Sequence, residues 1–493
     1  MSGLNLQGRV MSMPTPPFRD ERIPRAADSD AFRQFMASGW DSCETNAQVT
    51  VGAAEAARRH RELLSEQWSG HSIIVASGRP LIRSADQHYE FRAHSDFAWL
   101  TGCDEPGAAL VMRPTGTGHE PVLFIPPPWG PSDPGFYLDV VRGPLWVGPL
   151  PGLASWAEAL GIEVRPIDEL DSVVERLSRV RFAGDTHMIR GWGAPVSDGL
   201  RETLATLRLV KDEWEVQQLR LAVDVTIDGF DEVAREVPQA VRRGGERWLQ
   251  GTFDRHARTF GNGVGYRTIV GSGPHAPVLH WTAGTGAVRE GDVLLADMGV
   301  EVPTLYTADV TRTMPVTGEF TEAQRTVYDI VHEAHLAALA ACGPGRPFSA
   351  FSEAAMRVLA EGLHDLGLLP VSVEQALSPA GQQHRRFIVC GVGHHLGLDV
   401  HDCAQADYDD YQGADLAPGM VFTVEPGLYF HPSDTCVPPE LRGIGVRIED
   451  DVLVTPGGVE VLSAALPADS RGVEKWMSRR LEAAANHEKT IEK

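Results

Sequence analysis

The stretch 294–313, LLADMGVEVPTLYTADVTRT, constrains the fold most, because it carries two acidic residues inside apolar, strand-like sequence. Gly299 and Pro303 supply turn residues between two apolar runs, and this pattern predicts a β-hairpin. Asp297 and Asp309 would then lie on neighbouring strands of the hairpin. The two carboxylates would be close enough to share one ligand.

Two buried carboxylates at this separation need a counter-charge. They repel each other, and burial adds the free energy of removing each charge from water, so a metal ion between them is the simplest expectation. The hairpin alone also allows a second interpretation, in which Asp309 pairs with Arg312 at the surface while Asp297 caps a turn. Motifs in other parts of the chain are needed to decide between the metal site and the surface ion pair.

Length and charge limit the possible classes of protein. The 493 residues exceed what one hydrophobic core usually supports, so two domains are expected. The net charge of −23 repels phosphate backbones and anionic membrane surfaces, so nucleic acid is not an expected partner. No apolar run approaches the ~20 residues of a membrane span. Six scattered cysteines without a CxxC pair, and an N-terminus without a secretory apolar core, favour a cytoplasmic protein.

Composition and periodicity divide the chain into four predicted segments. Residues 1–45, rich in Pro, Arg, Asp and Ser, read as an extended N-terminal arm. In residues 46–210 short strands alternate with helices, which predicts an α/β domain, and no GxGxxG or P-loop marks a nucleotide site there. In residues 211–466 the order of predicted helices and strands favours an α+β domain with a curved antiparallel sheet backed by helices. Residues 467–493 are predicted to be a charged, helix-prone tail that lies on the surface.

Several elements are expected within the two domains. The segment 91–114 is predicted to be strand and turn, and 277–282 to be a strand. Apolar residues recur with a helical period in 212–230. The other predicted helices are 53–68, 246–260, 321–341 and 350–367, and the other predicted strands include 72–77, 121–128, 164–167, 180–184, 265–270, 420–426 and 443–454.

Three further stretches, 391–402, 421–429 and 443–454, place acidic or imidazole groups in apolar or glycine-rich sequence. One buried glutamate could be balanced by an arginine, with Arg447 as a candidate, but four acids and a histidine are harder to explain in that way. Four carboxylates and one imidazole make a hard, oxygen-rich donor set that suits a pair of Mn²⁺-like ions, whose charge they balance.

The motifs around these groups, ADVTRT, HxxGLDVHD, TVEPGLY and GVRIED, resemble the metallopeptidase family of aminopeptidase P and prolidase, the pita-bread enzymes. The resemblance is strong over about residues 210–460. It extends more weakly to SDFAWLTGCDEPGAALVM, which is similar to the N-terminal domain of aminopeptidase P and of creatinase relatives. It implies an α/β creatinase-like domain followed by a pita-bread catalytic domain.

The resemblance also implies a role for each metal ligand. Asp297 would chelate one ion alone, Asp309 and Glu449 would bridge both ions, and His394 and Glu425 would complete the site of the other. The two ions would lower the pKa of a water molecule held between them. This water would attack the peptide carbonyl on the amino side of a proline, with Glu425 as its proton acceptor.

Three more residues match family positions around the ligands. His401 and His280 would stabilise the tetrahedral intermediate and orient the proline, and Arg447 would hold a ligand carboxylate. Strand alternation would put His395 on the face of His401, but the seven-residue offset of the family pattern selects His394. Ion pairs or turns are expected for the neighbouring acids Asp399, Asp402, Asp450 and Asp451.

The preferred interpretation is a di-manganese Xaa-Pro aminopeptidase that acts on peptides with proline second and forms a dimer or tetramer. The large first domain favours it over the dipeptidase prolidase and over methionine aminopeptidase, which usually lacks such a domain. Two other classes stay open: a creatinase-type enzyme that works without metal, and a non-catalytic binding module on the same fold. Five intact ligand positions count against both.

Overall fold

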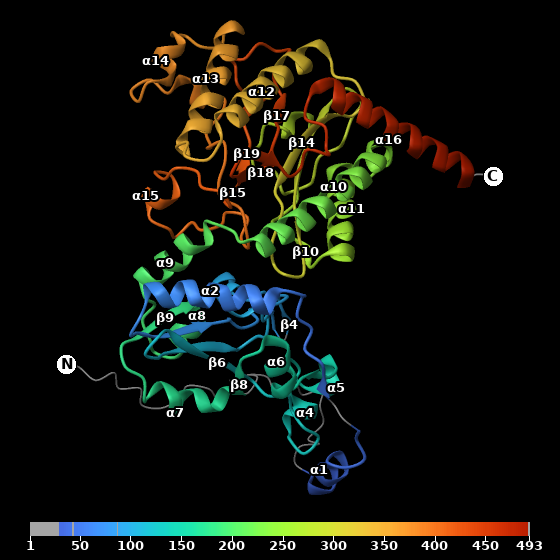
Figure 1. Cartoon of the computed structure of the whole chain (residues 1–493). Helices are drawn as coiled ribbons and strands as arrows, with labels where there is room; N and C mark the ends of the chain where they lie inside the picture. Colours follow the sequence, from blue (N-terminus) through green and yellow to red (C-terminus); the bar gives the residue numbers. More distant parts are fainter. Residues whose placement is uncertain (1–28, 42–43, 86, 492–493) are drawn as a thin grey trace. The chain divides into compact units, whose positions relative to one another are not determined.

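The computed structural model describes residues 29–41, 44–85 and 87–491. The chain divides into two compact units, residues 1–207 and 208–493, whereas the sequence predicted a boundary after residue 210. In Figure 1 the first unit runs from blue to blue-green and the second from green to red. Among the helices of the described residues, none combines the length and the apolar character needed to cross a membrane.

The predicted N-terminal arm falls only partly within the described residues, because 1–28 lie outside them. Residues 30–36 form the helix α1 (Asp30–Met36), so this part of the segment is helical where the sequence predicted extended chain. The α1 residue Phe32 packs its ring edge-on against Tyr137, with 5.2 Å between the ring centroids. Aromatic packing of this kind stabilises a helix too short to be stable alone.

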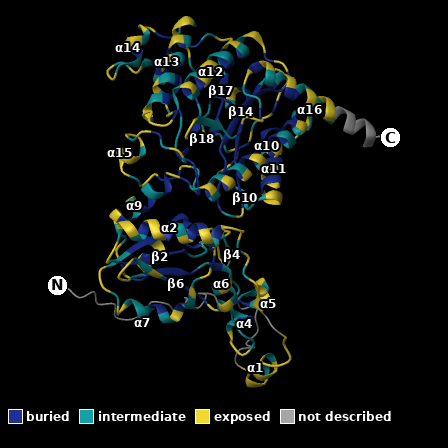
Figure 2. Ribbon diagram, viewed as in Figure 1, coloured by how far each residue is buried: buried dark blue, intermediate teal, exposed yellow. Residues whose placement is uncertain are grey.

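A five-stranded mixed sheet in the order β8-β6-β5-β2-β9 forms the centre of the first unit. All five positions of β2 are buried, because helices cover both faces of the sheet, and Figures 1 and 2 show α2 over one face and α7 over the other. This confirms the predicted α/β domain. Its main elements are α2 (Ala53–Gln67), β2 (Ser72–Ala76), β5 (Ala109–Pro114), β6 (His119–Ile125), α6 (Leu153–Leu160), β8 (Glu163–Pro166), α7 (Leu170–Val174), β9 (Val180–Gly184), α8 (Thr186–Gly191) and α9 (Asp198–Arg208).

The predicted strand and turn over 91–114 is wrong in its first half, where Ser95–Thr101 forms the helix α3. Phe97 and Leu100 are three positions apart, so a helix brings both to one face, and both are fully buried. Gly102 then ends the helix in the left-handed region, with φ 68°.

Long helices surround the sheets of the second unit. Figure 1 shows the strands β14, β17 and β18 with α12 and α13 on one side and α10 and α11 on the other. Gly229 of α10 allows close packing, because a Cβ there would lie 2.6 Å from the ring of Phe253 in α11. These helices are α10 (Glu213–Arg242), α11 (Gly245–Phe260), α12 (Glu322–Ala341), α13 (Ser349–Asp365) and α16 (Ser470–Ile491).

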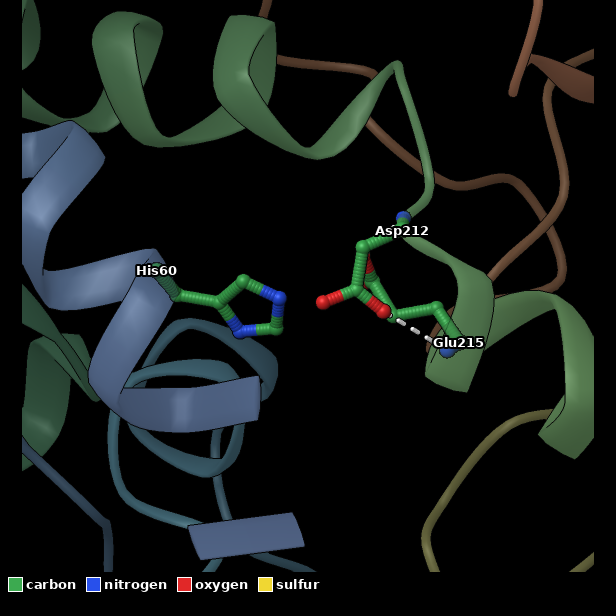
Figure 3. A group of neighbouring side chains, drawn as sticks. All are labelled: His60, Asp212 and Glu215. Carbon is green, nitrogen blue, oxygen red and sulfur yellow. Dashed lines mark hydrogen bonds between the residues drawn. The ribbon is translucent and has the colours of Figure 1, made fainter. Parts of the chain in front are cut away.

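The helix α10 begins with reciprocal caps, which Figure 3 shows in part as the hydrogen bond between Asp212 and Glu215. The Glu215 backbone N–H donates to Asp212 Oδ1 at 3.0 Å, and the Asp212 N–H donates to Glu215 Oε2 at 2.9 Å. At the other end of the unit, α16 buries Trp476 and Met477. The predicted C-terminal tail is therefore helical, but its predicted surface position is wrong for the first turns, which belong to the core of the second unit.

The strands of the second unit pair antiparallel. An isolated bridge between Thr311 and Glu449 joins the sheet of β14 to the segment between β17 and β18. The strands are β10 (Gly263–Val264), β11 (Ile269–Ser272), β12 (Val293–Met298), β13 (Val300–Glu301), β14 (Val310–Pro315), β15 (Val421–Val424), β16 (Gly427–Tyr429), β17 (Gly445–Arg447), β18 (Asp450–Thr455) and β19 (Gly458–Val461).

The predicted hairpin is confirmed as β12 paired with β14, with Asp297 opposite Thr311. Gly299 allows the chain to close here, because a Cβ there would lie 1.8 Å from the carbonyl oxygen of Ala308. The predicted strand 277–282 is wrong. Turn hydrogen bonds run from Val278 N to the His275 carbonyl and from Trp281 N to the Val278 carbonyl, so the segment is a series of turns.

Candidate metal centre

Asp297 and Asp309 enter the site from the hairpin, and both are buried. Both carboxylate oxygens of Asp297 accept hydrogen bonds: Oδ1 from the Tyr266 hydroxyl at 2.6 Å and Oδ2 from Arg447 Nη2 at 2.5 Å. Asp309 directly precedes β14, and its backbone N–H donates to Asp451 Oδ2 at 3.1 Å. Each aspartate is therefore fixed by a neighbour from another segment of the second unit.

The two glutamates lie where strands end. Glu449 lies between β17 and β18, and its Oε2 accepts a hydrogen bond from the Thr311 hydroxyl at 2.6 Å. Glu425 directly follows β15, and its backbone N–H donates to the Val392 carbonyl at 2.9 Å. The Thr423 hydroxyl donates to Glu425 Oε1 at 3.2 Å. Strand ends thus turn both acidic side chains towards the same site.

His394 lies beside two of these acids. Its Nε2 is 3.2 Å from Asp309 Oδ2 and 3.4 Å from Glu425 Oε1. The neighbouring His395 is fully buried elsewhere, stacked on Phe348 with 4.6 Å between ring centroids. The structure thus brings His394, and not His395, to the acidic cluster.

The five predicted ligands come together as one connected group. Ligand atoms of Asp309, His394 and Glu449 all lie within 4.8 Å of one another, a separation that one metal ion can span. Glu425 joins the group through His394. Asp297 joins it through Arg447, whose Nε is 4.0 Å from Glu449 Oε2.

The electrostatics of the cluster favour a cation. Burial raises the pKa of Asp297 to about 6, and the charge of Asp309 adds to the shift while Arg447 opposes it. Burial likewise raises the pKa of Glu425 to about 7 and that of Glu449 well above its ordinary value. Although burial works in the opposite direction, Asp309 and Glu425 raise the pKa of His394 to about 9. These carboxylates repel one another, and divalent cations would relieve the repulsion, so the donor set fits a hard metal.

The three residues predicted around the ligands have different environments. Arg447 is buried and donates to Asp297, to the Thr311 hydroxyl at 3.0 Å and to the Tyr429 hydroxyl at 3.1 Å. His401 is an exposed loop residue, and its ring lies edge-on to that of His394 with 4.4 Å between centroids. His280 is exposed in the turns that follow β11, and its charge contributes to lowering the pKa of His401, after burial and His394.

The surface ion pair considered for the hairpin is not what the structure contains. Arg312 is completely buried, and its Nη2 donates to Asp450 Oδ1 at 2.6 Å. Its Nη1 donates to the Glu449 carbonyl at 2.7 Å. Arg312 therefore braces the backbone beside the site and does not neutralise Asp309 at the surface.

The ion-pair expectation for the neighbouring acids holds for three of the four. Asp399 pairs with Arg208 at 3.0 Å, Asp402 with Arg208 and Lys211, and Asp450 with Arg312. Asp451 differs, because its Oδ2 accepts from the Asp309 backbone while its Oδ1 is buried without a hydrogen-bond partner in the described residues. Burial, with the charge of Asp309, raises the pKa of Asp451 well above its ordinary value.

Several residues that contact the site were not predicted from the sequence, among them Tyr266, Thr311 and Tyr429. Thr311 could have been predicted from the sequence. It lies two positions after Asp309 in a predicted strand, so both side chains are expected on the same face of the sheet. Tyr266 could not have been predicted in this way, because 31 positions separate it from Asp297 and no local pattern links the two.

Known proteins match this chain over most of its length. Residues 217–456 match metallopeptidase family M24, and residues 56–182 match the aminopeptidase P N-terminal domain. Xaa-Pro aminopeptidase 1 of Streptomyces coelicolor is 42% identical over 462 residues, which are 91% of this chain and 92% of the relative. Xaa-Pro aminopeptidase 2 of the same organism is 44% identical over 457 residues, which are 90% and 95% of the two chains.

A solved structure shares the fold. Aminopeptidase P from Escherichia coli with the inhibitor Pro-Leu has a TM-score of 0.77 and 30% identity, covering 89% of this chain and 100% of that one. This confirms the predicted order of an α/β N-terminal domain and a pita-bread domain. The chain belongs to metallopeptidase family M24, with the N-terminal domain of the aminopeptidase P branch ahead of its hydrolase domain.

Proposed function

We propose that this enzyme is a dinuclear-metal Xaa-Pro aminopeptidase, which hydrolyses the bond between an N-terminal residue and a proline in second position. The convergence of four carboxylates and one imidazole in one site carries the proposal. The names of the relatives, and the Pro-Leu inhibitor of the Escherichia coli protein, support this substrate class.

Two divalent ions would be held by five side chains of the second unit. Mn²⁺ is the proposed metal, because hard carboxylate oxygens make up most of the donor set. When bound, the ions would polarise the peptide carbonyl and lower the pKa of a water molecule. The proposed ligands are Asp297, Asp309, His394, Glu425 and Glu449.

The other steps belong to residues of the chain. Glu425 would accept the proton of the attacking water on its carboxylate. His401 and His280 would donate hydrogen bonds to the carbonyl oxygen as negative charge develops there. Arg447 would keep the carboxylate of Asp297 in one orientation through its bond to Oδ2.

A peptide assay tests the proposal. The purified full chain is stripped with a chelator and incubated with Gly-Pro or with a longer Xaa-Pro-Xaa peptide, with and without Mn²⁺. Release of the first residue from the longer peptide, only with metal, is the expected result. Cleavage of the dipeptide alone would indicate a prolidase, and no metal-dependent cleavage would indicate a non-catalytic module.

Replacing Glu425 by Gln tests the proton acceptor. The variant keeps the shape of the side chain but removes a charge and the basic oxygen, so kcat is expected to fall by about 10²–10⁴-fold. Circular dichroism should show an unchanged fold. Turnover at the wild-type rate would refute the role given to Glu425.

We also propose a cytoplasmic location and a homo-oligomer, either a dimer or a tetramer. The cysteines that the structure describes carry free thiols, which accords with a reducing compartment. The oligomer rests on the family resemblance, and light scattering of the full chain would test it. The free cysteines are Cys103, Cys342, Cys390, Cys403 and Cys436.

A further inference from the structure

Thr311 lies where three parts of the proposed metal centre meet. It stands opposite Asp297 in the β12–β14 pairing, and its backbone carbonyl accepts from the Glu449 N–H at 3.1 Å. Its side chain is completely buried. Its hydroxyl donates to Glu449 Oε2 at 2.6 Å, within the range of hydrogen bonds from a hydroxyl to a carboxylate.

The same hydroxyl links Glu449 to Arg447. The Thr311 oxygen accepts from Arg447 Nε at 3.0 Å, while Arg447 Nε itself is 4.0 Å from Glu449 Oε2, beyond hydrogen-bond distance. The other end of the guanidinium donates to Asp297 Oδ2. One guanidinium therefore orients both acids, Asp297 directly and Glu449 through the Thr311 hydroxyl.

We propose that Thr311 is a positioning residue that fixes the Glu449 carboxylate for metal binding. The inference rests on the proposed function, because it gives Glu449 the role of a metal ligand. A hydroxyl can donate one hydrogen bond and accept others, so Thr311 relays the orientation set by Arg447. Each carboxylate oxygen has two lone pairs, so the bond from Thr311 leaves Glu449 free to bind ions.

Thr313 provides a matched control two positions along the same strand. Its side chain is also completely buried. Its hydroxyl, however, donates to the Arg447 carbonyl at 3.0 Å and accepts from the Arg447 backbone N–H at 3.1 Å. Replacing Thr313 by Val therefore removes a buried hydroxyl of the same kind without touching a proposed ligand.

The test is calorimetric titration of Mn²⁺ into the chelator-stripped full chain. Thr311→Val keeps the side-chain volume and removes the hydroxyl, and Mn²⁺ affinity is expected to fall about 10- to 100-fold. Thr311→Ser restores the hydroxyl and should bind within about threefold of wild type. Thr313→Val should also bind within about threefold of wild type, even where its thermal midpoint falls.

Different outcomes separate the inference from the function on which it rests. If Thr311→Val binds Mn²⁺ with wild-type affinity, the inference about Thr311 is overturned while the proposed function stands. The same holds if Thr313→Val loses as much Mn²⁺ affinity as Thr311→Val. No Mn²⁺ binding by the wild-type chain would overturn the proposed function and the inference with it. If Thr311→Val fails to fold, Thr311→Ala replaces it, and retention of wild-type affinity there overturns the inference in the same way.

Discussion

At the scale of single residues, buried charges in the second unit are arranged in networks and not in isolated pairs. Arg312 donates to Asp450, to the Glu449 carbonyl and to carbonyls of the segment that leads into α16. His335 approaches the second oxygen of Asp450, with 3.0 Å between Nε2 and Oδ2. Such a network is stable only while each charge keeps its partners.

Replacing Arg312 by Met should therefore destabilise the protein strongly. The change leaves Asp450 as a buried charge with only His335 and the Ser463 hydroxyl close to its carboxylate among the described residues, and we expect the free energy of unfolding to fall by about 3–5 kcal/mol. Urea unfolding followed by fluorescence measures it. Arg386→Met is the control, because Arg386 is half-exposed where it pairs with Asp434, and little change is expected there. Equal losses in both variants would contradict the argument.

At the scale of elements, loops that carry the proposed catalytic histidines are held by buried acids. Glu246 in α11 is completely buried and accepts hydrogen bonds from Trp281 Nε1 at 2.7 Å and from the Ser272 backbone at 3.0 Å. His275 stacks on Trp281 and lies 2.7 Å from the same carboxylate. This clamp fixes the turns in which His280 follows β11.

Loosening that clamp should reduce turnover more than stability. Trp281→Phe keeps the stacked ring but removes its N–H, so His280 shifts and kcat is expected to fall roughly tenfold, since small displacements of a reacting group are costly. Trp248→Phe is the matched control, because Trp248 Nε1 donates a solvent-exposed hydrogen bond of 2.7 Å to Glu236, outside this loop. Steady-state assays of the metal-loaded variants measure kcat. Equal kcat values in Trp281→Phe and Trp248→Phe would refute the role of the clamp in positioning His280.

The loop that carries His401 has a comparable anchor in Asp402. Although burial works in the opposite direction, Arg208 and Lys211 hold the pKa of Asp402 at about 2, below its ordinary value of 3.8. A carboxyl with a lowered folded pKa adds stability above its unfolded pKa, and this stability is lost as the pH falls towards the folded pKa.

Wild-type unfolding free energy should therefore fall more steeply between about pH 4 and pH 2 than that of Asp402→Asn, which cannot titrate. Urea unfolding at a series of pH values measures both slopes. Asp365→Asn, the same substitution at an exposed side chain, is the matched control. A variant of Asp402 with the wild-type slope would contradict the prediction.

At the scale of the whole molecule, the proposed metal centre is assembled from segments spread over residues 297–449 of the second unit. In the unfolded chain these five side chains are far apart on average, so they cannot bind the same ions together. Metal binding therefore depends on the folded second unit and stabilises it.

Removal of metal should lower the thermal midpoint of the protein. With Mn²⁺ at 100 times its dissociation constant, binding to the folded state alone adds about 2.7 kcal/mol. Scanning calorimetry with Mn²⁺ and with excess chelator measures the shift. Glu449→Gln, which removes one proposed ligand charge, should show a smaller shift, and an equal shift in the variant would argue against Glu449 as a ligand.

The sequence by itself determined the features that depend on neighbouring positions. The two apolar runs separated by Gly299 and Pro303 predicted the hairpin, and the helical period of 212–230 predicted the first part of α10. The types and order of five ligands, set in known motifs, indicated the family. Each of these signals lies within a short stretch of chain, where backbone geometry links spacing directly to structure.

Only the tertiary structure decided which distant side chains meet. It turned 95–101 into a helix and 277–282 into turns, and it placed Arg312 in the interior and not at the surface. It also brought Thr311 between Arg447 and Glu449, which lie more than 130 positions further along the chain. Contacts of this range are set by how whole elements pack, and the pattern within one stretch does not encode them.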